Sequence, residues 1–265
     1  MDLIDLVWFA AIIVSIFFFA LGSIFDLRTR EVDDWVWLVY GPIGLALTII
    51  RLFLDPSTLV LTLISIALTT LFSFGLFYFG LFGGADAKAV ICLGLTLPLI
   101  PTAFTPILGY VHPFFPIVAL ITGFLCSAAL TVWFGLGNLI TYLAHGKRLF
   151  EGLESEAWSK KALASILGYP TALTKLRNTF YLYPMEEIVI DDGRPRRTLK
   201  LYRNAETDRE PLVSELSDSF TKLGFKGEVW VTPGLPMLLF ILIGLVITLI
   251  FGDILFISVS LLFTR

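Results

Sequence analysis

Six long apolar stretches constrain this chain more than any other feature of its sequence. A helix needs about 20 apolar residues to cross the hydrocarbon core of a bilayer. Only 15% of the residues are charged and the mean hydropathy is +0.86, whereas about a quarter of the residues in a soluble domain are charged. The sequence therefore predicts an α-helical polytopic membrane protein with six transmembrane helices, at approximately Leu6–Phe25, Trp35–Leu54, Thr58–Phe82, Asp86–Phe104, Ile117–Leu143 and Leu235–Phe263.

The positions of the basic residues predict the orientation of these helices. With the N-terminus outside, the short inner connections hold Arg28, Arg30 and Lys88, and the long connection before the last helix holds fourteen more Lys and Arg residues. The outer side keeps only Arg51 and Arg265. Because basic residues accumulate on the cytoplasmic side, we expect an N-out, C-out, multi-pass protein of the plasma membrane.

The charge distribution also divides the chain into three expected parts. Residues 1–143 hold the first five helices, and residues 235–265 hold the last one. Residues 144–234 carry most of the charge and are expected to fold as a small cytosolic α+β domain inserted before the last helix.

Local patterns support a folded insertion. Apolar residues at helical spacing indicate an amphipathic helix within Glu151–Leu167. Glu187–Ile190 and Leu199–Tyr202 indicate the two strands of a β-hairpin around the turn residues 191–193, and Lys226–Thr232 indicates a further strand.

Four basic residues lie beside the expected hairpin, namely Arg194, Arg196, Arg197 and Lys200. We interpret them as a solvated cluster near anionic lipid headgroups, with a substrate-binding role as the alternative. Motifs for binding nucleic acid do not accompany them, so nucleic acid is not an expected partner.

Two aspartates lie at expected membrane boundaries. Asp26 ends the first apolar stretch, and Asp86 begins the fourth within Gly83-Gly84-Ala85-Asp86-Ala87-Lys88. A charge at the edge of hydrocarbon is costly and marks a functional candidate. The glycines permit close backbone approach, and Asp86 would lie in the first turn of a helix, where an anion is favoured. The expected topology places both carboxylates on the cytosolic side.

Two carboxylates that meet can share one proton and hydrolyse a peptide. The ionised group accepts a proton from water while the protonated group polarises the carbonyl, so neither a metal nor a cofactor is required. Asp253 also follows a glycine, but in a helix that begins at Leu235 it would lie about 27 Å along the axis, at the outer interface. Asp33 and Asp34 are expected to cap the second helix or to be solvated.

These residues resemble those of the archaeal preflagellin and type IV prepilin peptidases, which are GxGD-class membrane aspartyl proteases. The resemblance rests on D-x-R-T-R-E-V at Asp26–Val32, on G-G-A-D-A-K at Gly83–Lys88, on the six-helix layout with its cytosolic insertion, and on the segment Trp230–Pro236. It implies that Asp26 and Asp86 are the catalytic pair. Gly83 matches the first glycine of GxGD, whereas Ala85 replaces the second; Gly84 and Lys88 complete the motif.

The resemblance implies removal of the short basic class III signal peptide from archaellin or pilin precursors on the cytosolic side. Those precursors and the lipid bilayer would be the partners, and the sequence leaves the oligomeric state open. Glu31, Asp33 and Asp34 could attract the basic leader. Bacterial relatives often have paired C-x-x-C motifs and some methylate the new N-terminus, but Cys92 and Cys126 lack that spacing, so we expect neither zinc nor methyl transfer.

Three alternatives stay open. Pro233-Gly234-Leu235-Pro236 is similar to the proline-containing motif before the last helix of presenilin-like and signal-peptide-peptidase-like proteases, which cut inside the bilayer. A transporter could use carboxylates as a proton relay, although it would favour midplane acids and internal repeats. A membrane scaffold would tolerate substitution of Asp26 or Asp86, which separates it from the enzymes.

Overall fold

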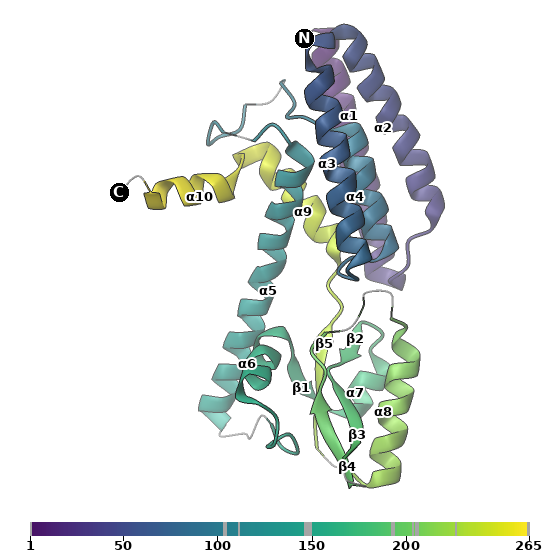
Figure 1. Ribbon diagram of the computed structural model, residues 1–265, viewed down its shortest axis with the longest axis vertical. Coiled ribbons are helices and arrows are strands. Elements are labelled where there is room, and N and C mark those ends of the chain that lie inside the picture. Colours follow the sequence, from purple (N-terminus) through teal and green to yellow (C-terminus); the bar gives the residue numbers. More distant parts are fainter. Residues whose placement is uncertain are drawn as a thin grey trace. The chain divides into compact units, whose positions relative to one another are not determined.

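The computed structural model describes the chain in eight segments, residues 2–102, 105–110, 112–145, 150–191, 194–202, 204, 207–225 and 227–263. The chain forms two compact units. The first consists of Met1–Ser127 together with Pro236–Arg265, and the second of Ala128–Leu235 (Figure 1).

The first unit is helical. Its helices are α1 (Leu3–Thr29), α2 (Asp34–Leu54), the 3-10 turn η1 (Pro56–Thr58), α3 (Leu59–Tyr78), α4 (Gly84–Thr96), the beginning of α5 (Phe115–His145), α9 (Met237–Phe251) and α10 (Ile254–Phe263). Helices α1 to α4 form a bundle (Figure 1). Within it, α1 packs against α2 and α9, and α4 packs against both α2 and α3.

Among the described residues, four helices are long and apolar enough to cross a membrane. They are Leu3–Thr29, Asp34–Leu54, Pro56–Tyr78 and Phe115–Ala144. The expected last span is not one straight helix, because α9 and α10 are bent by 59° relative to each other. If α9 and α10 together form one broken span, the described residues contain up to five candidate membrane spans.

Helix α4 is much shorter than the fourth apolar stretch predicted. It has 13 residues and is therefore about 20 Å long, against about 30 Å of hydrocarbon. The prediction of a helix over Asp86–Phe104 is wrong beyond Thr96, and Phe104 lies outside the described residues. Six full-length spans are consequently not found in the part of the chain that the structure describes.

Side chains of neighbouring helices bind the carbonyl groups where α4 ends. Thr48 Oγ1 of α2 donates a hydrogen bond to the Leu95 carbonyl at 2.7 Å, and Ser65 Oγ of α3 donates to the Pro98 carbonyl. Backbone groups left unpaired in an apolar environment are costly. The early end of α4 is thus stabilised by hydroxyl groups that the apolar pattern alone does not reveal.

Glycines allow α5 and α9 to approach closely. A Cβ atom added at Gly244 of α9 would lie 2.3 Å from the Ala119 carbonyl oxygen and 2.4 Å from the Gly123 nitrogen of α5. These are backbone atoms, so the clash cannot be relieved by a change of rotamer. The two helices would have to separate.

We therefore expect Gly244→Ala to lower the thermal stability of the protein, with a cost of about 1–3 kcal/mol, as for other overpacked positions. Gly75→Ala in α3 is the matched control, because a Cβ atom there would have nothing within 4 Å. Thermal unfolding in detergent gives the melting temperatures of the two variants. Equal melting temperatures for the two variants would contradict the close contact.

The second unit combines short helices and strands with the C-terminal part of α5. Its elements are α6 (Trp158–Leu167), β1 (Tyr169–Thr171), α7 (Leu173–Asn178), β2 (Leu182–Pro184), β3 (Glu186–Asp191), β4 (Arg194–Leu199), α8 (Arg209–Leu223) and β5 (Val229–Pro233). Strands β1 and β2 pair antiparallel on either side of β5, and β3 pairs antiparallel with β4. Helix α8 packs against β2 and β3.

The predicted elements of this unit are confirmed in type. The predicted second strand of the hairpin, Leu199–Tyr202, is wrong: β4 is Arg194–Leu199, and residues 200–202 do not lie in a strand. The hairpin pairs Glu186 with Leu199 and Asp191 with Arg194. The further strand expected is β5, the central strand of its sheet. The amphipathic helix begins later than predicted, at Trp158. The turn residues Asp192 and Gly193 lie outside the described residues, as does Lys226.

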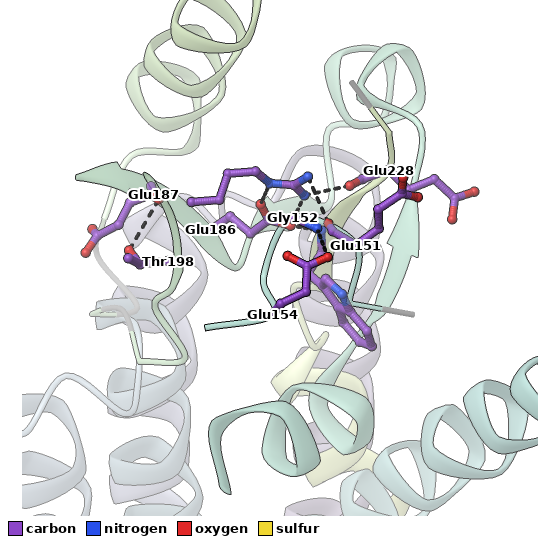
Figure 2. A network of polar contacts seen from close by, with 9 residues as sticks. Glu151, Gly152, Glu154, Glu186, Glu187, Thr198 and Glu228 are labelled. Carbon is purple, nitrogen blue, oxygen red and sulfur yellow. Dashed lines mark hydrogen bonds and ion pairs between the residues drawn. The ribbon is translucent and has the colours of Figure 1, made fainter. Parts of the chain in front are cut away.

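One member of the basic cluster beside the hairpin, Arg197, is buried and not solvated. Arg197 is 3% exposed, and its Nε and Nη2 atoms donate to the two carboxylate oxygens of Glu186 at 2.8 and 2.9 Å. Figure 2 shows Glu186 in this network, with Glu151 and Glu228, whose carbonyl groups also accept hydrogen bonds from Arg197.

The other described members of the cluster are paired too. Lys200 Nζ lies 2.8 Å from Glu187, and Arg196 Nη2 lies 3.9 Å from Glu156. The interpretation as a headgroup-binding cluster is therefore wrong for Arg197, which is buried and paired with Glu186. Glu186 is its diagonal neighbour on the hairpin, because the residue directly opposite Arg197 is Ile188.

Candidate active site

Asp26 lies in the last turn of α1, and its side chain is 15% exposed. The helix ends because Arg30 adopts a left-handed conformation, with φ 62° and ψ 13°, and its N–H donates to the Asp26 carbonyl. This conformation is unusual for a residue other than glycine. It brings Arg30 Nη1 to 3.7 Å from Asp26 Oδ1, where the guanidinium can compensate a negative charge on the carboxylate.

Arg30 is a site residue that the sequence analysis did not single out. The sequence did contain one signal for its contact with Asp26, namely the spacing of four residues between them, because residues four apart in a helix lie on the same face. A left-handed arginine at the end of a helix has no comparable sequence signal.

Asp86 lies in the first turn of α4 and is half-buried. The preceding Gly83 is the N-cap residue, and its N–H donates to Asp86 Oδ2 at 3.3 Å. Helix N-termini stabilise negative charge. The carboxylate is consequently oriented by the beginning of its own helix, and Ala85 packs against the apolar core of the bundle.

The end of α1 and the beginning of α4 lie at the same end of the bundle (Figure 1). Two contacts with the beginning of α2 fix this arrangement. The rings of Phe25 and Trp35 are 6.4 Å apart between centroids, and Lys88 Nζ lies 2.6 Å from Asp34 Oδ1. Helices α1 and α4 also contact each other directly. The structure thus places the two predicted carboxylates at one end of one helical unit.

The acidic residues predicted to attract a leader lie beside Asp26. Glu31, Asp33 and Asp34 are all exposed at the connection from α1 to α2. The ion pair with Lys88 already compensates the charge of Asp34. Glu31 and Asp33 are better placed to offer negative charge to a basic peptide.

Asp253 has a structural role at the bend between α9 and α10. It is 8% exposed, its Oδ1 accepts the Phe256 N–H at 2.9 Å, and its own N–H donates to the Tyr110 carbonyl. These contacts cap α10. They account for a buried aspartate without a catalytic role.

Two family models match successive parts of the chain. The model described as the type IV leader peptidase family matches residues 12–132, and the model described as archaeal peptidase A24 C-terminus type II matches residues 160–254. Together they cover most of the sequence. The chain belongs to the type IV leader peptidase family. It is therefore a membrane peptidase, and both Asp26 and Asp86 lie within the first matched region.

Curated relatives of this type IV leader peptidase family member are preflagellin peptidases. The protein of Methanocaldococcus jannaschii is 27% identical over 88% of this chain and 90% of its own length. The proteins of Methanococcus maripaludis and Methanococcus voltae are 24% and 22% identical, each over 88% of this chain and 91% of its own length. The similarity extends through both compact units.

Proposed function

We propose that this protein is an aspartic endopeptidase that removes the leader from preflagellin precursors, type IV pilin precursors or both on the cytosolic side of the plasma membrane, with Asp26 and Asp86 as the catalytic pair. The observation that carries the proposal is the position of these carboxylates at one end of the helical unit, in the last turn of α1 and the first turn of α4. The relatives named preflagellin peptidase support the substrate class.

In the proposed reaction, one carboxylate accepts a proton from water and the other, protonated, donates a hydrogen bond to the scissile carbonyl. The oxygen of the water bonds to the carbonyl carbon. The C–N bond then breaks as a proton passes to the leaving nitrogen. Water and the two carboxyl groups account for every proton, so a nucleophilic side chain is not needed.

The location of the pair suits a cut at the end of an apolar segment. A substrate helix can stay in the bilayer while its polar leader extends from the membrane edge. Glu31 and Asp33 lie exposed in the connection from α1 to α2, and we propose that they interact with the basic residues of the leader.

A cleavage assay in membranes tests this function. A preflagellin precursor with a basic leader is incubated with membranes that contain the protein, and the N-terminus of the product is sequenced. We expect a new N-terminus at the junction of leader and apolar segment. A cut inside the apolar segment would favour the intramembrane-protease alternative, and an intact precursor would overturn the proposal.

A further inference from the structure

Helix α6 has an exposed apolar face. Trp158, Leu163 and Ile166 are 82%, 50% and 44% exposed, and we refer to them as the α6 apolar face. The opposite side of the helix packs into the second unit, where Ala164 is fully buried in a cluster with Leu153, Met185, Leu199 and Trp230. Large apolar side chains exposed on the outer side of an amphipathic helix make that side a candidate interaction site.

Helix α5 is longer than a membrane is thick. Its apolar part, Phe115–Ala144, has 30 residues, which corresponds to about 45 Å, against about 30 Å of hydrocarbon. A helix that enters the bilayer near Phe115 therefore reaches the opposite edge of the hydrocarbon about 20 residues later, near Gly135. The remaining turns lie at the level of the headgroups or beyond.

Helix α6 is attached to α5 at this level. Asn138 Nδ2 donates hydrogen bonds to the carbonyl groups of Ser165 and Gly168 at 2.7 and 2.6 Å. A Cβ atom at Gly135 would lie 3.8 Å from Ile166 Cγ1. These contacts hold α6 against the C-terminal half of α5 (Figure 1), so the position of α5 in the membrane also sets the depth of α6.

The neighbouring surface is aromatic as well. A cavity of about 300 Å³ is lined by residues of α5 and β1 and by Glu228, and its lining includes Trp133, Phe134 and Tyr169. It also includes Asn138, which binds the carbonyl groups of Ser165 and Gly168. Trp133 is 72% exposed. Tryptophan and tyrosine are enriched at the membrane–water interface because their rings are amphipathic.

We propose that the α6 apolar face lies in the interface of the lipid bilayer and fastens the second unit to the membrane surface. Lipid is the occupant that fits, because the face continues from a membrane-spanning helix at the depth where the hydrocarbon ends. An amphipathic helix lying in the interface buries its apolar side chains among the headgroups and the ends of the acyl chains. The α6 apolar face contains no charged side chain, so its binding to the bilayer should not require anionic lipids.

Spin labels on the full-length protein in phosphatidylcholine nanodiscs test this proposal. Single cysteines are introduced as Leu163→Cys on α6 and, in a second protein, as Leu223→Cys on α8, after replacement of Cys92 and Cys126 by alanine. The two leucines match because both lie on helices and are 50% and 46% exposed. Accessibility of each label to oxygen, which partitions into lipid, is compared with accessibility to a water-soluble nickel chelate.

We expect the ratio of oxygen to nickel accessibility to be several-fold higher at position 163 than at position 223. Equal ratios at both positions would overturn the proposal. A label at position 163 that neither reagent reaches would also overturn it, because that result means that protein, not lipid, covers the α6 apolar face.

Discussion

Asp26→Asn and Asp86→Asn are each expected to lower the rate of leader cleavage by about 10²–10⁴-fold, the usual contribution of a general acid or base. The amide has nearly the volume of the carboxyl group but can neither accept a proton from water nor share one with its partner. For Asp86 the structural role can persist, because an amide oxygen can still accept the Gly83 N–H. The initial rate of leader release from a preflagellin precursor is the measurement.

Asp253→Asn is the matched control for this prediction. Asp253 is also acidic and membrane-associated, but its side chain caps α10 through the Phe256 N–H, a contact that an asparagine oxygen can keep. We expect cleavage to stay near the wild-type rate. If Asp26→Asn or Asp86→Asn retained full activity in a folded protein, that aspartate would have no part in the chemistry. A similar loss in all three variants would indicate a structural cause.

The positions of both candidate carboxylates could be predicted because each ends or begins an apolar stretch. Hydropathy locates such boundaries directly, and the structure has Asp26 in the last turn of α1 and Asp86 in the first turn of α4. The interaction between Arg30 and Asp26 was not predicted, because it depends on a left-handed backbone conformation. Side-chain patterns do not encode that conformation for an arginine.

The lengths of the membrane helices were predicted less well, because hydropathy counts side chains and ignores the backbone. Residues 86–104 are apolar almost throughout, yet α4 ends at Thr96, just before Pro98. Proline is a recognised stop signal for a helix, and the apolar pattern obscured it. The bend after α9 likewise occurs at Gly252, where φ is 93° and a Cβ atom would lie 2.4 Å from the Tyr110 oxygen.

In the second unit, the sequence revealed β3 and β5 and missed β1, β2 and most of β4. The hairpin was predicted from its first strand, β3, and from its turn residues, but its second strand was expected at Leu199–Tyr202, whereas β4 is Arg194–Leu199. Strands β1 and β2 have three residues each and contain Pro170 and Pro184, and proline is normally a signal against a strand interior. The burial of Arg197 depends on its ion pair with Glu186, a diagonal neighbour on the hairpin that only the folded register reveals.

Arg197→Met is expected to destabilise the second unit by about 3–5 kcal/mol, the cost of breaking a buried ion pair from one side. The side chain of Glu186 is fully buried and would lose both hydrogen bonds from the guanidinium. It would keep the Trp230 N–H, which donates to Glu186 Oε1 at 2.7 Å. A neutral backbone N–H cannot replace the positive charge of the guanidinium beside a carboxylate removed from water. Hydrogen exchange of the amides of β3, β4 and β5 in the full-length protein measures the change.

Lys200→Met provides a control on the same hairpin. Lys200 and Glu187 also pair at 2.8 Å between β3 and β4, but their side chains are 47% and 38% exposed. Exposed pairs contribute about 0–1 kcal/mol, so exchange should hardly change. Glu186→Gln combined with Arg197→Met should recover part of the lost protection, because a neutral amide is cheaper to bury than an unpaired carboxylate. Equal amide hydrogen exchange in Arg197→Met and Lys200→Met would contradict the prediction, because it would mean that the buried ion pair stabilises the hairpin no more than the exposed one.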